Sequence, residues 1–184
     1  SDYYSRAANG GVGFAKAAGN YAASFYPTKL ANDEGYEQII WTDDSTHEYF
    51  EESGTMNVFV RINDTIYTPP TSEKILDGVT RDSFIQLAER RGIELKVEPI
   101  SVKSVVEAHR NGSLKEAWGV GTAVVTTLFK AIGYQGEKLE LPLLSLEDSF
   151  ALTLQKDLVD LQTNVAEDPF GWRVLVEKNI LETV

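Results

Sequence analysis

The chain has 184 residues, with 17 Lys and Arg against 28 Asp and Glu, which gives a net charge of −11. An apolar fraction of 42% excludes disorder of the whole chain, and the acidic balance argues against binding to nucleic acid. The sequence has no cysteine, only two histidines far apart (His47 and His109), and no apolar run long enough to cross a membrane. We therefore expect a cytoplasmic protein with no metal site, folded as one domain over residues 1–184.

The first third of the chain predicts a loop, a helix and a strand. Residues 9–13 are rich in glycine and predict an irregular loop. A helix is expected over residues 21–32, ended by Gly35, and Pro27 inside it predicts a kink or an interruption. Residues 38–42 are expected to form a short strand.

The middle of the chain predicts a hairpin, then a helix, a strand and a second helix. Residues 58–62 and 65–68 read as two strands joined by the two-residue turn Asn63-Asp64. Thr80 stands where the N-cap of a helix is expected, and Arg90-Arg91-Gly92 would end that helix. Residues 94–100 alternate like a strand, and residues 102–109 predict a short helix.

The last third predicts two apolar strands and one long helix. Residues 116–118 and 123–129 are apolar and β-branched, with Gly119-Val120-Gly121 expected as the turn between them. Ser145 and Asp148 make a capping-box pattern before a helix with one apolar side, formed by Phe150, Leu154, Leu158 and Leu161. Strands and helices alternate irregularly, and this order predicts a mixed α/β fold without a regular βαβ repeat.

One lysine stands out as a candidate for covalent catalysis. Lys16 is the only charged residue between Arg6 and Lys29. A lysine that is partly desolvated has a lowered pKa, and its neutral amine can form an imine with a carbonyl. An ordinary solvated lysine is the alternative, because no spacing rule marks an imine-forming lysine.

Three further segments would complete a site around such a lysine. Residues 78–80 precede a helix and residues 119–123 form a Gly-rich segment with a hydroxyl, so either could bind a phosphate, although each is also typical of an ordinary cap or turn. Residues 51–57 place Glu51 and Glu52 before a turn, which by itself is typical of a solvated strand end. A pyridoxal phosphate site requires an isolated lysine, turns that can bind a phosphate, and a carboxylate, and these segments together offer all three.

These segments together resemble the branched-chain aminotransferases, which are fold-type IV pyridoxal-phosphate enzymes. The resemblance rests on four motifs in order, Gly13 to Tyr21, Glu52 to Asn57, Leu76 to Arg81 and Gly119 to Ala123. It runs from about Tyr3 to about Trp172. It implies the fold of the family's large C-terminal domain, with a hairpin and a pseudo-barrel-like core.

The resemblance also implies a role for each matching residue. Lys16 would form the internal aldimine with pyridoxal 5'-phosphate and would then move the proton between Cα and the cofactor. Tyr21 would hydrogen-bond the phenolate oxygen of the ring, and Glu52 would pair with the pyridine nitrogen. The phosphate would be held by Val79, Thr80 and Thr122, and the substrate by Thr55, Thr122 and Ala123.

The activity implied is ping-pong transamination of leucine, isoleucine and valine with 2-oxoglutarate, in a cytoplasmic homodimer. Two departures are visible: Asp77 stands where many members have proline, and the cysteine pair of some animal members is absent. The chain starts just ahead of the Lys16 motif, so we expect it to lack the family's small N-terminal lobe. That lobe would supply an arginine to the phosphate and part of the substrate pocket.

Three alternatives stay open at this point. Within the same fold, D-amino acid aminotransferase and aminodeoxychorismate lyase share the general site. The segment Glu52 to Asn57 and the tail Asp168 to Trp172 favour the branched-chain group. The third alternative is a folded module without catalysis, isolated from its partner lobe.

Overall fold

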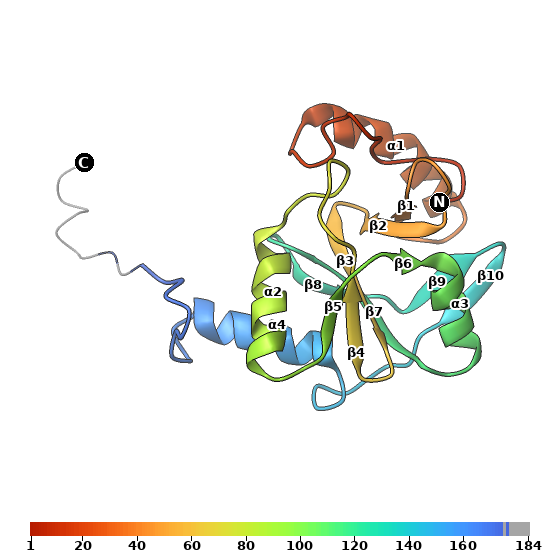
Figure 1. The fold of residues 1–184 in the computed structure, drawn as a ribbon. Helices are drawn as coiled ribbons and strands as arrows, with labels where there is room; N and C mark the ends of the chain where they lie inside the picture. The colour runs from red at the N-terminus through yellow and green to blue at the C-terminus, as the bar shows by residue number, and fades with distance from the viewer. Residues whose placement is uncertain (175, 177–184) are drawn as a thin grey trace.

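The computed structural model describes residues 1–174 and 176 and has a mixed α/β architecture, as the sequence predicts (Figure 1). Its helices are α1 (Ala18–Asp33), α2 (Val79–Arg90), α3 (Val102–Arg110) and α4 (Phe150–Gln162). Its strands are β1 (Ile40–Thr42), β2 (Tyr49–Ser53), β3 (Met56–Ile62), β4 (Thr65–Thr68), β5 (Leu95–Val97), β6 (Ile100–Ser101), β7 (Leu114–Gly121), β8 (Val125–Leu128), β9 (Ala131–Tyr134) and β10 (Glu137–Glu140). None of the helices over these residues has the length and apolarity to cross a bilayer.

Strand β3 is the centre of an eight-stranded sheet. Along one edge β3 pairs with β7 from Asn57 to Ile62, and β8 continues the sheet beyond β7. Its start pairs with β2 and its end pairs with β4, so the sheet divides there into a β1-β2 arm and a β4-β5 arm. Strands β9 and β10 form a separate hairpin.

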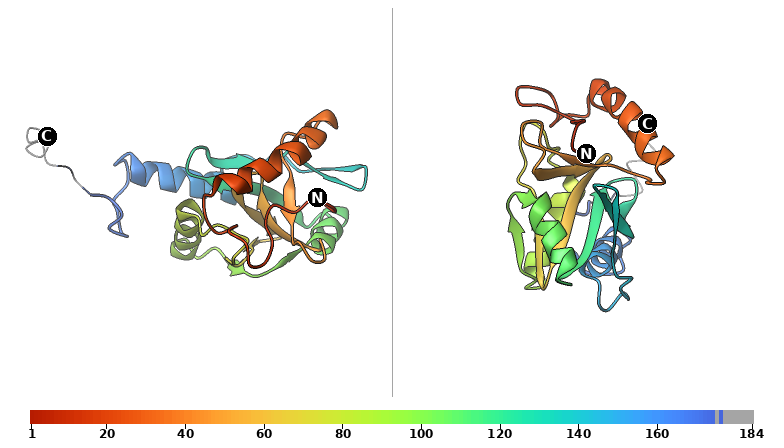
Figure 2. Two further views of the ribbon diagram at one scale, coloured as in Figure 1. Left: turned by 90° about the horizontal axis from the view of Figure 1, so that it is seen from above. Right: turned by 90° about the vertical axis from the view of Figure 1, so that its right-hand side faces the viewer.

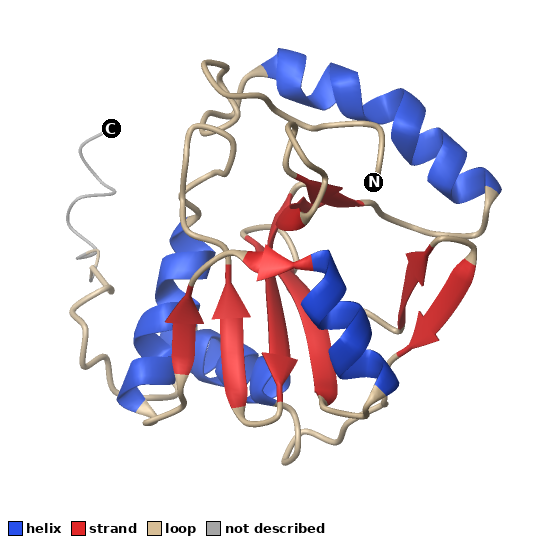
Figure 3. Ribbon diagram, turned by 45° about the vertical axis from the view of Figure 1, so that its right-hand side comes forward, coloured by secondary structure: helices blue, strands red, loops and turns tan. Residues whose placement is uncertain are grey.

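The two faces of the sheet bury separate apolar cores, because alternate residues of a strand point to opposite faces. Phe59 and Trp118 pack with α2 and α4 on one face, where their rings stack 5.4 Å apart. Val58 and Val60 pack with α3 and the β9-β10 hairpin on the other face. Figures 1 and 3 show the helices on the two sides of the strands.

Helix α1 lies apart from both cores, beside β1 and β2, as two further views show (Figure 2). Pro27 is its only buried residue, and Phe25 is 71% exposed. The helix runs through Pro27 without interruption, so of the predicted kink or interruption the interruption is wrong. Because α1 buries so little apolar surface, polar contacts hold the segment before it to the rest of the molecule.

Several predicted boundaries need correction. Gly119-Val120-Gly121 is part of β7 and not a turn; Gly119 lies against Met56 of β3, where a side chain would collide. Gly78 and not Thr80 is the N-cap residue of α2. The expected strand over 94–100 is two short strands, β5 and β6, which pair with different partners.

Two further features of the second half differ from the sequence prediction. Ser145 and Asp148 hydrogen-bond each other in a turn before α4, but Ser149 is the residue whose side chain caps that helix. The sequence pattern does not predict the β9-β10 hairpin. Its loop, Gln135-Gly136, has two positive φ angles, the geometry of a tight hairpin turn.

Candidate active site

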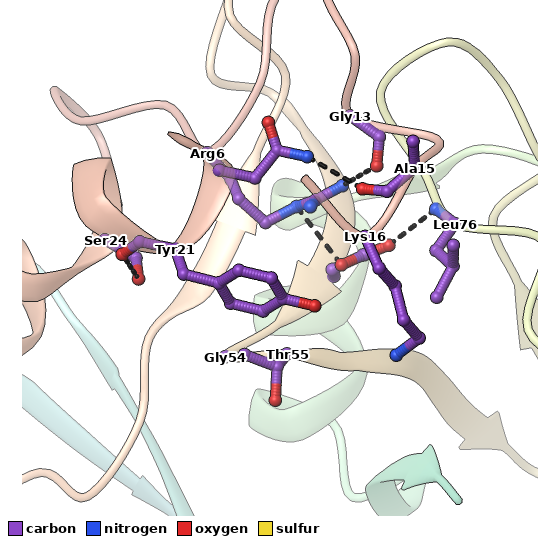
Figure 4. A pocket seen from close by; sticks show the side chains of 11 residues that line it. Arg6, Gly13, Ala15, Lys16, Tyr21, Ser24, Gly54, Thr55 and Leu76 are labelled. Carbon is purple, nitrogen blue, oxygen red and sulfur yellow. Dashed lines mark hydrogen bonds and ion pairs between the residues drawn. The ribbon is translucent and has the colours of Figure 1, made fainter. Parts of the chain in front are cut away.

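A pocket between the start of α1 and the β2-β3 turn brings together four of the residues that the sequence singles out (Figure 4). Lys16, Tyr21, Glu52 and Thr55 all line it. In the close-up Tyr21 extends to the right, Lys16 extends downward beside it, and Thr55 lies below Tyr21. Lys16 and Thr55, which are 39 positions apart in the chain, thus line the same pocket. Neither the segment around Lys16 nor the segment around Thr55 forms the pocket alone.

The loop that carries Lys16 is held to α1 by Asn20. The Asn20 side chain donates to the carbonyls of Val12 and Ala15, both at 2.9 Å. Lys16 itself is exposed, so the expectation of a partly desolvated lysine is wrong for this chain. The uncharged stretch around it forms the loop and first turn of a surface helix, whose small residues bury little.

Glu52 is buried, with an exposed fraction of 3%, and so is Glu51 at 4%. The alternative of a solvated strand end is therefore wrong. Burial raises the pKa of Glu52 to about 7, against the opposing effects of the Arg6 charge and of the hydrogen bond from the Leu76 N–H. A carboxyl group whose pKa lies near neutrality, facing a pocket that also holds a lysine, is a typical feature of a functional site.

Glu52 has two partners that sequence reasoning missed. Arg6 Nε lies 3.1 Å from Glu52 Oε2 in an ion pair, and the N–H of Leu76 donates to Oε1 at 2.7 Å. Both residues line the pocket. The sequence did offer one signal, because a carboxylate at an inward strand position needs a cation from elsewhere. It could not indicate which of the 17 Lys and Arg residues supplies it.

The predicted phosphate residues Val79 and Thr80 lie at the start of α2, outside the pocket. The first turn of a helix leaves its N–H groups free, and the hydrogen bonds of α2 begin with Asp82 N to Gly78 O at 3.0 Å. Gly78 packs against the side chain of Asn57, which pairs in register with Glu52. The start of α2 therefore lies beside the end of the sheet that carries Glu52.

Thr122 and Ala123 are exposed and form the turn between β7 and β8, also outside the pocket. Asn57 lies opposite Val120, so β3 begins where β7 ends. The turn with Thr55 and the turn with Thr122 consequently lie at the same end of the sheet. Val125, which follows the second turn, has φ +58°, a strained conformation for a β-branched residue.

The pocket by itself is too small to hold a cofactor. The enclosed volume of the pocket is about 20 Å³, whereas ligand pockets usually enclose roughly 300–1,000 Å³. The donor set fits pyridoxal phosphate: an amine that can form an imine, a buried carboxylate for the ring nitrogen, a phenol, and free N–H groups of a helix start. Among the described residues, no cluster of His, Asp and Glu could hold a metal ion.

The fold and this site define a class of proteins. The family model for class IV amino-transferases matches residues 12–128, which include the whole Lys16 and Glu52 region, and the chain belongs to this family. Branched-chain-amino-acid transaminase 1 of Bacillus subtilis (strain 168) is 42% identical over 175 residues. That match covers 95% of this chain and 49% of the relative. The chain thus spans about half the length of the curated relatives it matches.

Comparison with solved structures agrees with this family assignment. The branched-chain amino acid aminotransferase of Escherichia coli superposes with a TM-score of 0.74 at 28% identity, covering 92% of this chain and 52% of that one. The branched-chain amino acid aminotransferase from Thermobaculum terrenum, in its PLP-form, superposes with a TM-score of 0.73 at 20% identity, over 89% of this chain and 50% of that one, and supports the fold alone. The resemblance inferred from the four motifs is confirmed.

Proposed function

We propose that this chain is the cofactor-binding half of a branched-chain amino acid aminotransferase that uses pyridoxal 5'-phosphate. The observation that carries the proposal is the pocket in which Lys16 and Tyr21 meet a buried carboxylate, Glu52. The name of the 42% identical Bacillus relative supports the substrate class. Transamination of leucine, isoleucine and valine with 2-oxoglutarate follows as the reaction, in a cytoplasmic homodimer.

Each residue would have a distinct task. Bound pyridoxal phosphate withdraws electrons from the Cα of an attached amino acid, so that its Cα proton becomes acidic. Lys16 would be the base that accepts the Cα proton and later gives it back. Glu52 holds a proton at the ring nitrogen, and Tyr21 donates to the phenolate oxygen. The N–H groups of Val79 and Thr80 bind the phosphate, with the hydroxyls of Thr80 and Thr122 beside them.

The substrate side would be formed by Thr55, Thr122 and Ala123, at the end of the sheet where the two turns meet. Backbone N–H groups of the Thr122-Ala123 turn are suited to the α-carboxylate of the amino acid. The small volume of the pocket and the match to only 49% of the Bacillus relative support a second contribution from another half of the enzyme. An arginine for the phosphate and the rest of the side-chain pocket are part of that proposed contribution.

The test is to trap the lysine that binds the cofactor. Pyridoxal phosphate is added to the protein, and borohydride then reduces the imine between the cofactor and the lysine to a stable amine. Peptide mapping identifies the lysine that carries this label. We expect the label on Lys16 and none in Lys16→Ala. Lys29→Ala is the matched control, since Lys29 is an exposed lysine of α1 paired with Asp33 at 2.6 Å. A label on another lysine would contradict the assignment.

A substrate assay separates the related activities of the fold. We expect the protein, with its other half present, to convert leucine and 2-oxoglutarate. Activity with D-alanine instead of leucine would indicate a D-amino acid aminotransferase, and pyruvate release from aminodeoxychorismate would indicate the lyase. A labelled Lys16 with no turnover of any of these would leave the non-catalytic module as the correct description.

A further inference from the structure

Arg6 contacts three separate segments of the candidate site. Its side chain is 9% exposed, and its Nε forms the ion pair with Glu52. One terminal nitrogen donates to the carbonyl of Gly13 at 3.1 Å and to the carbonyl of Lys74. Glu52 lies on β2, Gly13 lies three residues before Lys16, and Lys74 lies in the loop that leads to Gly78 and α2. A single guanidinium therefore joins the carboxylate, the lysine loop and the loop before the proposed phosphate site.

The loop that carries Lys16 packs at Gly13 directly against the loop of residues 73–74. A side chain on Gly13 would come within 2.8 Å of Lys74 Cα and within 2.5 Å of Ala7 Cβ, so only glycine fits. The N–H of Phe14 donates to the carbonyl of Glu73 at 3.0 Å. Apolar burial contributes little here, and the relative position of the two loops depends on these polar contacts.

Arginine suits this position better than lysine would. The guanidinium presents five donors in a rigid planar fork, which can meet a carboxylate and two carbonyls at once. An ammonium on a flexible stem has the same charge but cannot hold several acceptors in fixed directions. Arg6 thus supplies a positive charge beside Glu52 and two directed hydrogen bonds to the backbone carbonyls of Gly13 and Lys74.

We propose that Arg6 is a positioning residue of the aminotransferase site, which keeps Glu52 charged through an ion pair and holds the Lys16 loop against the loop before α2. This inference rests on the proposed function, because Glu52 is the partner of the ring nitrogen there. Arg6 acts through Glu52 and through the backbone of residues 13 and 74. It is assigned no contact with substrate.

The charges around Glu52 explain why its charged state depends on Arg6. The charged groups that affect it are Arg6 and Lys16, which favour the carboxylate, and Glu51, which opposes it. Lys16 is exposed and contributes least, so Arg6 is the main cation that favours the charged form against burial. Without Arg6 the proton would stay on Glu52, and a neutral acid holds the ring nitrogen in its unprotonated form.

The structure also contains a matched control. Arg61 lies at the other end of β3, is 12% exposed, and pairs with the buried Glu116 at 3.4 Å while donating to the carbonyls of Asn63 and Asp148. Both arginines thus join a buried glutamate to two backbone carbonyls. Arg61→Ala should lower the melting temperature about as much as Arg6→Ala, although it lies far from the pocket.

The experiment uses the cofactor-loaded protein and measures the protonation of the ring nitrogen by ¹⁵N NMR of labelled cofactor, alongside kcat and KM. In Arg6→Ala we expect the nitrogen signal to shift toward the unprotonated form at neutral pH. We expect kcat to fall about 10- to 100-fold, as for loss of a charge-assisted contact, with KM changed less. Arg6→Lys should give a nitrogen signal and a kcat between those of the wild type and Arg6→Ala. It replaces Arg6→Ala in the experiment if that variant does not fold.

A double variant tests whether Arg6 acts through Glu52. Adding Arg6→Ala to Glu52→Gln should reduce kcat far less than Arg6→Ala does in the wild type. The inference on Arg6 would be overturned if the effects of the two substitutions on kcat were fully additive, or if the nitrogen signal were unchanged in both Arg6 variants. The proposed function would still stand in that case, provided that Lys16 is labelled. The same signal shift in Arg61→Ala would show a merely structural effect and also overturn it. Failure of the wild type to label Lys16 would overturn both proposals.

Discussion

Two buried glutamates at opposite ends of the central sheet differ in how completely they are satisfied. Glu116 accepts from Ser149 Oγ at 2.6 Å, from the N–H of Phe150 at 2.8 Å, and from the N–H of Ala151 and from Arg61 at 3.4 Å. Glu52 has only Leu76 N–H and Arg6. A carboxylate offers about four acceptor positions. Glu116 uses its positions to cap α4, whereas Glu52 keeps acceptor capacity open toward a pocket.

The number of hydrogen bonds that each glutamate accepts distinguishes a buried carboxylate that supports the fold from one that is available for function. A buried charge that is fully paired supports the fold, and its removal leaves uncompensated partners. A buried charge that is under-satisfied raises the free energy of the folded state, and the proposed cofactor nitrogen would supply the missing partner. The following predictions test this distinction, in order of decreasing effect.

Glu116→Ala should destabilise the protein by about 3–5 kcal/mol, because it leaves Arg61 without its buried partner and removes the side chain that caps α4. Glu52→Ala should cost less at pH 8, since the folded state already disfavours the charged form of Glu52. Urea unfolding of the cofactor-free variants measures both. Equal losses would show that the two glutamates are not distinct in this respect.

Glu52→Gln should lower the rate per bound cofactor roughly 100-fold, about 2.7 kcal/mol, while cofactor binding changes little. An amide still contacts the ring nitrogen but does not keep it protonated, and the phosphate contacts are unchanged. Glu116→Gln is the control and should leave the rate intact. The measurement is kcat together with cofactor titration; loss of cofactor with a normal rate per bound cofactor would contradict the role of Glu52.

The stability of the cofactor-free protein should carry a pH signature from Glu52. Its pKa rises from 4.5 to about 7 on folding, so between these values the folded state keeps a proton that the unfolded state releases. The free energy of unfolding should therefore fall as pH rises through this window, by on the order of 3 kcal/mol, and level off above it. Subtracting the profile of Glu52→Gln isolates the effect of Glu52. A flat difference across this window would contradict it.

The family, most of the helices and strands, and the main candidate site residues could be predicted from the amino-acid sequence alone. The alternation in residues 58–62 and 65–68 and the apolar side of α4 reflect local periodicity, which burial on one face requires. The motifs around Lys16 and Glu52 indicated a pyridoxal-phosphate site because those residue types suit its chemistry. The roles of Val79, Thr80, Thr122 and Ala123 stay predictions, although the register of β3 and β7 places both turns at one end of the sheet.

Which residues contact one another, and how deeply each is buried, depends on the folded arrangement of distant segments. Gly119 belongs to a strand because it pairs with Val58 of β3, a non-local contact that overrides the turn tendency of glycine, and Gly121 pairs with Val125 of β8. Lys16 is exposed and Glu52 is buried, the reverse of what their neighbours in the sequence suggest. Arg6 was invisible as a site residue because its partners lie 7, 46 and 68 positions along the chain. Burial and ion pairing depend on distant segments, and local sequence carries no record of them.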